Sequence, residues 1–220
     1  MIQSLWSASS GMQAQQLSLD NVANNMANVN TPGFKKSRVD FQDLLYSEIR
    51  EPDRMTRMGQ VVTNGIQIGS GARPSSTQLI FEQGSIQQTG NPMDIAISGN
   101  AFFEVTLPDG SKAYTRDGSF KVDSKGYLVT GGGYRSSITS ANGELLTFEK
   151  GSSNINIDEK GVIFRDGQEL GRINLAHFTN PAGLGKIGSN LYLQTVNSGA
   201  PQDAADYTLN SGALEMSNVQ

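Results

Sequence analysis

Apolar residues recur every seven positions near the N-terminus of this 220-residue chain. The first position of the repeat holds Leu5, Met12, Leu19 and Met26. The position three residues later holds Ala8, Gln15, Val22 and Val29, so one polar residue interrupts the pattern. Residues 3–29 contain no proline and a single glycine, Gly11. An apolar heptad of this kind predicts one long α-helix, which we place at residues 1–30, with a narrow apolar stripe along one side.

The remaining surface of this predicted helix is polar but almost uncharged. Residues 1–34 carry one charged side chain, Asp20, and are rich in Gln, Asn and Ser. Solvated helix faces usually carry Lys and Glu, and a helix with so narrow a stripe is marginal by itself in water. We therefore expect it to pack against other protein on several sides, with partner helices along the apolar stripe. An ordinary amphipathic helix packed on its own domain is the alternative.

The helix is expected to end before Asn30, since Thr31 precedes Pro32 and Gly33 allows a turn. An extended connector is expected over residues 31–73. Within it, residues 39–49 fit a short helix or an extended segment, and the polar residues 50–65 fit an irregular segment. Its apolar and basic side chains suit contact with another chain, and those expected to make it are Arg54, Met55, Arg57, Met58, Val61 and Val62.

From about residue 66 the sequence changes to short alternating runs separated by turn dipeptides such as Asp109-Gly110 and Lys160-Gly161. This spacing is typical of antiparallel strands, and we expect a β-rich domain over residues 74–205. The strands are predicted at residues 101–107, 112–116, 127–130, 154–157, 162–165 and 172–177. The predicted fold class is thus α+β, mainly β, and residues 206–220 form a return segment.

Composition excludes several function classes. The 17 basic and 21 acidic residues leave a net charge of −4, which argues against nucleic acid or an anionic membrane as partner. The chain has no Cys and one His, His177, so thiolate zinc sites and three-histidine metal sites are impossible. Gly69-Ser70-Gly71 lacks the third glycine and the following helix of a dinucleotide loop. We expect no enzyme activity, no metal and no cofactor.

The run from Leu19 to Lys35 (LDNVANNMANVNTPGFK) resembles the N-terminal signature of the flagellar rod and hook proteins. Further similarity lies in residues 41–46, 65–74, 94–97, 101–103, 114–120, 188–192 and 198–201, and within the family it is greatest to the distal rod proteins. The signature residues carried over from the resemblance are Asn24, Asn25, Asn28, Asn30, Thr31, Pro32, Gly33 and Phe34.

The resemblance implies a structural subunit that polymerises helically into a hollow drive shaft, which transmits torque to the hook and passes exported proteins. It implies these partners: further copies of the chain, the proximal rod protein, the hook protein, the P- and L-ring proteins and the flagellar type III export apparatus. The implied location is the basal body, where the rod spans the periplasm after export without a cleaved signal peptide. Family members end in a long heptad helix that pairs with the N-terminal one, and this sequence stops at Gln220, where that helix should begin.

Other functions stay open at this stage. A proximal rod protein or a hook-type axial protein is the alternative within the family. A secreted β-rich binding module with a helical oligomerisation segment is the alternative outside it. That module needs an exposed ligand face, and the aromatic residues available for it are Phe102, Phe103, Tyr114, Phe120 and Tyr127. A core role for these rings is the competing prediction.

Overall fold

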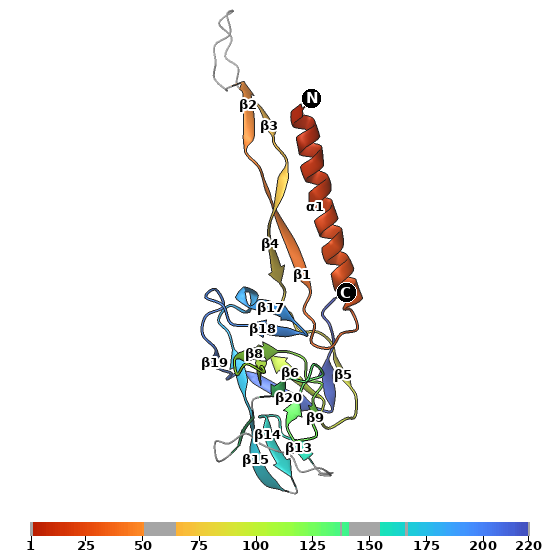
Figure 1. The fold of residues 1–220 in the computed structure, drawn as a ribbon, viewed down its shortest axis with the longest axis vertical. Helices are drawn as coiled ribbons and strands as arrows, with labels where there is room; N and C mark the ends of the chain where they lie inside the picture. Colours follow the sequence, from red (N-terminus) through yellow and green to blue (C-terminus); the bar gives the residue numbers. More distant parts are fainter. Residues whose placement is uncertain (1, 51–64, 137, 141–154, 166, 220) are drawn as a thin grey trace, which may run out of the picture. The chain divides into compact units, whose positions relative to one another are not determined.

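The computed structural model describes residues 2–50, 65–136, 138–140, 155–165 and 167–219 (Figure 1). They divide into two compact units. The first comprises Met1–Met26 and Ser37–Leu79, and the second comprises Ala27–Lys36 and Ile80–Gln220. The second unit is therefore built from two separate stretches of the chain.

The predicted N-terminal helix is present as α1 (Ile2–Ala27), one uninterrupted helix (Figure 1). Its end is followed by a turn in which the backbone N–H of Thr31 donates to the carbonyl of Asn28 at 3.2 Å. Among the described residues, no helix combines the length and apolar character needed to cross a membrane.

Among the described residues of the first unit, four strands follow: β1 (Ser37–Asp43), β2 (Tyr46–Arg50), β3 (Ile66–Gly69) and β4 (Ala72–Leu79). β1 pairs with β4 and β2 pairs with β3, both antiparallel, so the chain runs out along one side and returns along the other. Residues 39–49, which fit either helix or extended chain, are thus mostly extended. The boundary expected between residues 73 and 74 falls inside β4.

A broad antiparallel sheet dominates the second unit, in the strand order β17-β18-β8-β7-β11-β10-β9, and β16 pairs with both β7 and β19. Its strands are β7 (Phe102–Thr106), β8 (Lys112–Thr115), β9 (Lys121–Val122), β10 (Leu128–Val129), β11 (Arg135–Ser136), β16 (Leu175–His177), β17 (Gly185–Gly188), β18 (Leu191–Leu193) and β19 (Gln202–Asp203). A short 3-10 helix, Pro181–Gly183, precedes β17.

Smaller sheets complete this unit. A four-stranded sheet has the order β12-β15-β14-β13, and two ladders join β20 to β6 and β21 to β5. These strands are β5 (Ile86–Gln88), β6 (Ile95–Gly99), β12 (Ile138–Ser140), β13 (Ile155–Ile157), β14 (Val162–Arg165), β15 (Gln168–Ile173), β20 (Tyr207–Ser211) and β21 (Ala213–Glu215). The α+β, mostly antiparallel fold class is confirmed. The return segment, residues 206–220, supplies β20 and β21.

Local turn chemistry explains two hairpins that were predicted from sequence. Gly110 lies between β7 and β8 with a φ of 83°, and Gly161 lies between β13 and β14 with a φ of 79°. Both φ values are in the left-handed region, which glycine adopts without steric cost.

The core of the second unit lies between its sheets. Its main buried cluster includes Ile95, Ile97, Phe103, Phe120 and Ile163. Phe102 and Tyr114 are also buried and meet Phe178 edge to face, at ring-centroid distances of 5.8 Å and 4.7 Å. Four of the five aromatic residues considered for a ligand face are therefore core residues.

Tyr127 is the exception among those five aromatic residues. It is only partly buried, and the guanidinium of Arg135 lies 4.2 Å from its ring centroid. A single ring of this kind does not make the exposed aromatic face that the binding-module alternative requires.

Candidate functional site

The apolar heptad stripe of α1 is exposed in the single chain. Leu5 is 70% exposed, Met12 and Leu19 are each 68% exposed, and Met26 is 65% exposed. Val22 on the helix and Val29 in the turn after it are also exposed. Exposure of apolar side chains of this size to water is unfavourable, and the stripe extends along most of the helix. It therefore has the character of a contact surface.

A second stripe of α1 consists of small and polar residues. Its members are Ser7, Gly11, Ala14, Ser18, Asn21 and Asn25, and each is buried or partly buried. At about 100° per residue, this stripe lies about 110° round the helix from the apolar one. The two stripes therefore face in different directions.

Two asparagines of the second stripe contact the first residue of β1. The Nδ2 atom of Asn21 donates to Oγ of Ser37 at 2.8 Å. Asn25 bonds to the backbone of Ser37 in both directions, donating to its carbonyl at 2.8 Å and accepting from its N–H at 3.1 Å. The polar face that was expected to meet other chains thus bonds, at these positions, to the chain's own hairpin. Asn24, in contrast, lies on the exposed side of the helix.

The signature residues that follow the helix form a partly buried turn of the second unit. Asn28 Oδ1 accepts from the Thr31 hydroxyl at 3.3 Å, and the Phe34 N–H donates to the Thr31 carbonyl at 3.3 Å. The carbonyl of Pro32 accepts from Asn190 Nδ2 at 3.0 Å. Asn30 remains exposed. The turn is thus joined to the residue just before β18.

Gly33 occupies a position that no other residue fits. Its φ is 68°, and a Cβ placed on it would lie 2.5 Å from the backbone nitrogen of Asp117. Its N–H donates to the carbonyl of Glu215 at 2.8 Å. The glycine therefore brings the turn into direct backbone contact with two distant segments.

Phe34 is almost fully buried, and the ammonium of Lys186 lies 4.1 Å from its ring centroid. This distance is within the range of a cation–π contact. Burial lowers the pKa of Lys186, because water solvates its charged form less well there. Phe34, the aromatic residue of the signature, is therefore a core residue whose ring contacts a charged side chain.

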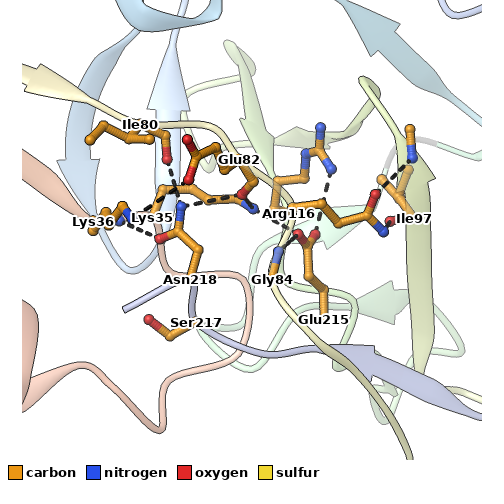
Figure 2. A network of polar contacts seen from close by, with 12 residues as sticks. Lys35, Lys36, Ile80, Glu82, Gly84, Ile97, Arg116, Glu215, Ser217 and Asn218 are labelled. Atoms are coloured by element: carbon orange, nitrogen blue, oxygen red, sulfur yellow. Dashed lines mark hydrogen bonds and ion pairs between the residues drawn. The ribbon is translucent and has the colours of Figure 1, made fainter. Parts of the chain in front are cut away.

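Lys35 lies at the centre of the polar network in Figure 2. Its side chain is completely buried, and Nζ donates to Glu215 Oε1 at 2.7 Å and to the Glu82 carbonyl at 2.6 Å. Glu215 Oε1 also accepts from the Gly84 N–H at 2.9 Å, and its Oε2 lies 3.5 Å from Arg116 Nη1. One carboxylate therefore faces two buried cations.

Burial has the same effect on both cations of this network. It lowers the pKa of Lys35 and of Arg116, because each charged form loses solvation, and the nearby Glu215 carboxylate opposes the shift in both cases. The Arg116 guanidinium also lies 4.9 Å from the centroid of the Phe102 ring. The charged groups thus depend on one another rather than on water.

Asn218 connects the same segments through its side chain. Its Oδ1 accepts from the Lys36 N–H at 2.7 Å, and its Nδ2 donates to the carbonyls of Ile80 and Glu82 at 2.8 Å and 3.2 Å. The Ile80 N–H donates in turn to the Lys36 carbonyl at 3.0 Å. Residues 33–36, 80–84 and 215–218 are therefore held together.

Sequence reasoning missed this network. Arg116 and Lys35 both lie in runs that resemble the rod and hook proteins, and this was the available signal. The importance of Glu215, Asn190 and Asn218 comes from pairings across more than 100 residues, which no local pattern reveals.

The connector side chains expected to contact another chain lie outside the described residues: Arg54, Met55, Arg57, Met58, Val61 and Val62. In the part of the chain that is described, no cluster of three or more His, Cys, Asp or Glu side chains suits a metal ion. His177 lies partly buried on β16. Gly69 ends β3 and Gly71 directly precedes β4, so a strand follows these glycines where a dinucleotide loop has a helix.

Two family models match the chain. The D1 domain of the flagellar hook protein FlgE/F/G matches residues 96–165, and the flagella basal body rod protein family matches residues 5–35. The match to the rod protein family, residues 5–35, contains the exposed stripe and the turn after α1. The match to the D1 domain, residues 96–165, contains β7, β8 and most of the main buried cluster.

Individual proteins match over greater lengths. The flagellar basal-body rod proteins FlgG of Borreliella burgdorferi and Buchnera aphidicola are 43% and 42% identical to this chain, and each alignment covers 100% of the chain and 85% of the relative. FlgG of Bacillus subtilis is 40% identical over 100% of the chain and 86% of its own length. The flagellar hook protein FlgE of Helicobacter mustelae is 45% identical over 61% of the chain and 30% of its own length. Full-length similarity at this level shows that the chain belongs to the family of flagellar basal-body rod proteins FlgG.

Proposed function

We propose that this chain is a structural subunit of the distal rod of the flagellar basal body and that its function lies in self-assembly. The exposed apolar stripe of α1 supports this most directly, since four of its side chains are 65–70% exposed in the single chain. In a polymer they become buried between neighbouring helices, which supplies hydrophobic free energy that the isolated chain lacks. The proposal assigns no catalysis to the chain.

Heterologous contacts between identical subunits generate open helical filaments. A subunit with one long apolar stripe on α1 and a separate β unit supports contacts of this type. Within the basal body we propose axial contacts to the proximal rod protein and the hook protein. We further propose that the P- and L-ring proteins surround the rod, that the rod spans the periplasm and that the chain is exported through the flagellar apparatus without a cleaved signal. These proposals rest on the resemblance to rod and hook proteins.

The predicted connector contacts remain a separate proposal based on sequence. Residues 50–65 are proposed to fill space between neighbouring subunits and so to stiffen the polymer. Packed interfaces resist the opening of voids that sliding requires. Removal of residues 50–65 is therefore expected to give a rod that assembles and bends.

A matched pair of substitutions on α1 tests the self-assembly proposal. Leu19 and Gln16 are both exposed in the single chain, but only Leu19 belongs to the apolar stripe. Leu19→Asp and Gln16→Asp add the same charge at neighbouring positions of one helix, so any general effect of the new carboxylate is shared. Only Leu19→Asp also removes an apolar contact from the proposed interface.

The two variants are compared in a strain that lacks its own distal rod protein. Electron microscopy of isolated basal bodies and swimming in soft agar are the measurements. We expect Gln16→Asp to restore rods and swimming, and Leu19→Asp to restore neither. Normal rods with Leu19→Asp contradict the proposed interface.

A hook-type axial role is the second candidate. The match to the D1 domain of the hook protein and the 45% identity to the Helicobacter mustelae hook protein favour it over unrelated functions. The same basal bodies distinguish the two candidates. Labelled subunits in the rod support the first proposal, and labelled subunits only in the hook support the second.

A further inference from the structure

The carboxylate of Glu215 joins segments that are far apart in the sequence. Glu215 ends β21, and Lys35 lies 180 residues before it. Both side chains are completely shielded from solvent, and Arg116 is 2% exposed. The contact is therefore formed inside the second unit.

The buried cluster of Lys35, Arg116 and Glu215 holds two cations and one carboxylate, so without Glu215 it would hold two cations alone. Among the described residues, Glu215 is the acidic side chain that makes an ion pair with Lys35 and with Arg116. The nearby Glu82 carboxylate is 72% exposed and pairs with Lys36 at 3.6 Å. Removing one partner of a buried ion pair leaves an uncompensated charge, and this is strongly unfavourable. Two buried cations therefore depend on one carboxylate.

Backbone and side-chain amide hydrogen bonds also hold residues 215–218 in the second unit. Glu215 accepts from the Gly33 N–H through its carbonyl, and the Met216 N–H donates to the Ser85 carbonyl at 2.8 Å. Asn218 accepts from the Lys36 N–H. Glu215 and Asn218 thus bond to Gly33 and Lys36, in the segment that follows α1.

We propose that Glu215 is a latch that couples the docking of residues 33–36 to the docking of residues 213–218. Without the carboxylate in place, the burial of Lys35 and Arg116 is unfavourable, so the turn after α1 stays open. With the carboxylate in place, residues 33–36 and residues 213–218 dock together. Because 180 residues separate the two partners, the latch closes only after almost all of the described chain is available. The latch is independent of the proposed function, since it concerns a single chain.

Glu215→Gln tests the latch in the 220-residue chain, because it removes the charge and keeps the shape and an acceptor oxygen. Glu82→Gln is the matched control, since it neutralises a nearby carboxylate that is exposed. The readout is amide hydrogen exchange at Gly33, Lys36 and Met216. None of these amides bonds to the Glu215 carboxylate, so a change there reports docking of the segments.

We expect Glu215→Gln to accelerate exchange at these three amides by on the order of a hundredfold. Exchange at Val105 and Ala113, in the paired strands β7 and β8, should change by less than about threefold. Glu82→Gln should leave both groups within about threefold. The latch is overturned if exchange at Gly33, Lys36 and Met216 does not accelerate. It is also overturned if the β7–β8 amides accelerate equally.

A second variant tests whether charge is the cause. Lys35→Met combined with Glu215→Gln removes one of the two uncompensated cations. We expect this double variant to regain at least about tenfold of the protection that Glu215→Gln loses at Met216. A double variant that exchanges faster than Glu215→Gln at this amide contradicts the role assigned to the charge.

Discussion

The side chain of Asn25 on α1 pairs with the backbone of Ser37 at the start of β1 as a neighbouring strand would, donating to its carbonyl and accepting from its N–H. The helix and the hairpin of the first unit are thus connected by an amide that satisfies two backbone groups at once. Buried and partly buried backbone groups require such partners. Asn25 therefore has a structural role in the first unit.

Asn25→Ala is expected to accelerate amide exchange at Ser37 by roughly five- to thirtyfold, which corresponds to about 1–2 kcal/mol for the lost hydrogen bonds. Gln16→Ala, an exposed position on the same helix, serves as the control and should leave Ser37 unchanged. Unchanged exchange in Asn25→Ala would show that water replaces the side chain without cost.

Gly33→Ala is expected to lower the free energy of unfolding of the second unit by about 3 kcal/mol or more, because backbone of Asp117 stands where the new Cβ must go. Gly110→Ala isolates the backbone contribution. Its φ is 83°, but a Cβ there meets nothing within 4 Å, so a loss of only about 1 kcal/mol is expected. Urea denaturation of both variants gives the comparison, and equal losses would refute the steric explanation.

Tyr192→Phe is expected to raise the free energy of unfolding by up to about 1 kcal/mol. The Tyr192 hydroxyl is buried and has no hydrogen-bond partner among the described residues, and burial raises its pKa. Tyr207→Phe should have the opposite effect, a loss of about 1 kcal/mol, because the Tyr207 hydroxyl accepts from Arg172 Nη2 and donates to the Lys160 carbonyl. A destabilised Tyr192→Phe would reveal a partner for that hydroxyl.

Two turn aspartates are expected to titrate below their ordinary pKa of 3.8. The Ser111 hydroxyl donates to the Asp109 carboxylate at 2.6 Å and lowers its pKa. The Tyr127 N–H, assisted by that of Lys125, does the same for Asp123. Each contribution to stability is therefore fully present above about pH 4 and is lost as the pH falls through the folded-state pKa. Carboxyl-carbon NMR titration measures both values, and a pKa at or above 3.8 would disprove the assignment.

Features set by neighbouring residues were predictable from sequence. The heptad predicted α1, and the dipeptides Asp109-Gly110 and Lys160-Gly161 predicted hairpins, because helix periodicity and turn geometry are local. The pairing of β1 with β4 was not predictable, since Ser37 meets Leu79 across 42 positions and β4 (ARPSSTQL) lacks apolar alternation. The role of Glu215 was also hidden, because its ion-pair partner Lys35 lies 180 residues earlier in the sequence.

The hydrogen bond from the Ile80 N–H to the Lys36 carbonyl joins the two points at which the chain leaves and re-enters the second unit. Residues 37–79 therefore leave the second unit and return to it between two residues, Lys36 and Ile80, that are hydrogen-bonded to each other. In an antiparallel ladder, two residues added to each strand lengthen it by about 7 Å and leave every side chain on its original face. Strand residues can thus be added to this hairpin in pairs without moving its side chains to the other face, and the bond between Lys36 and Ile80 is unaffected.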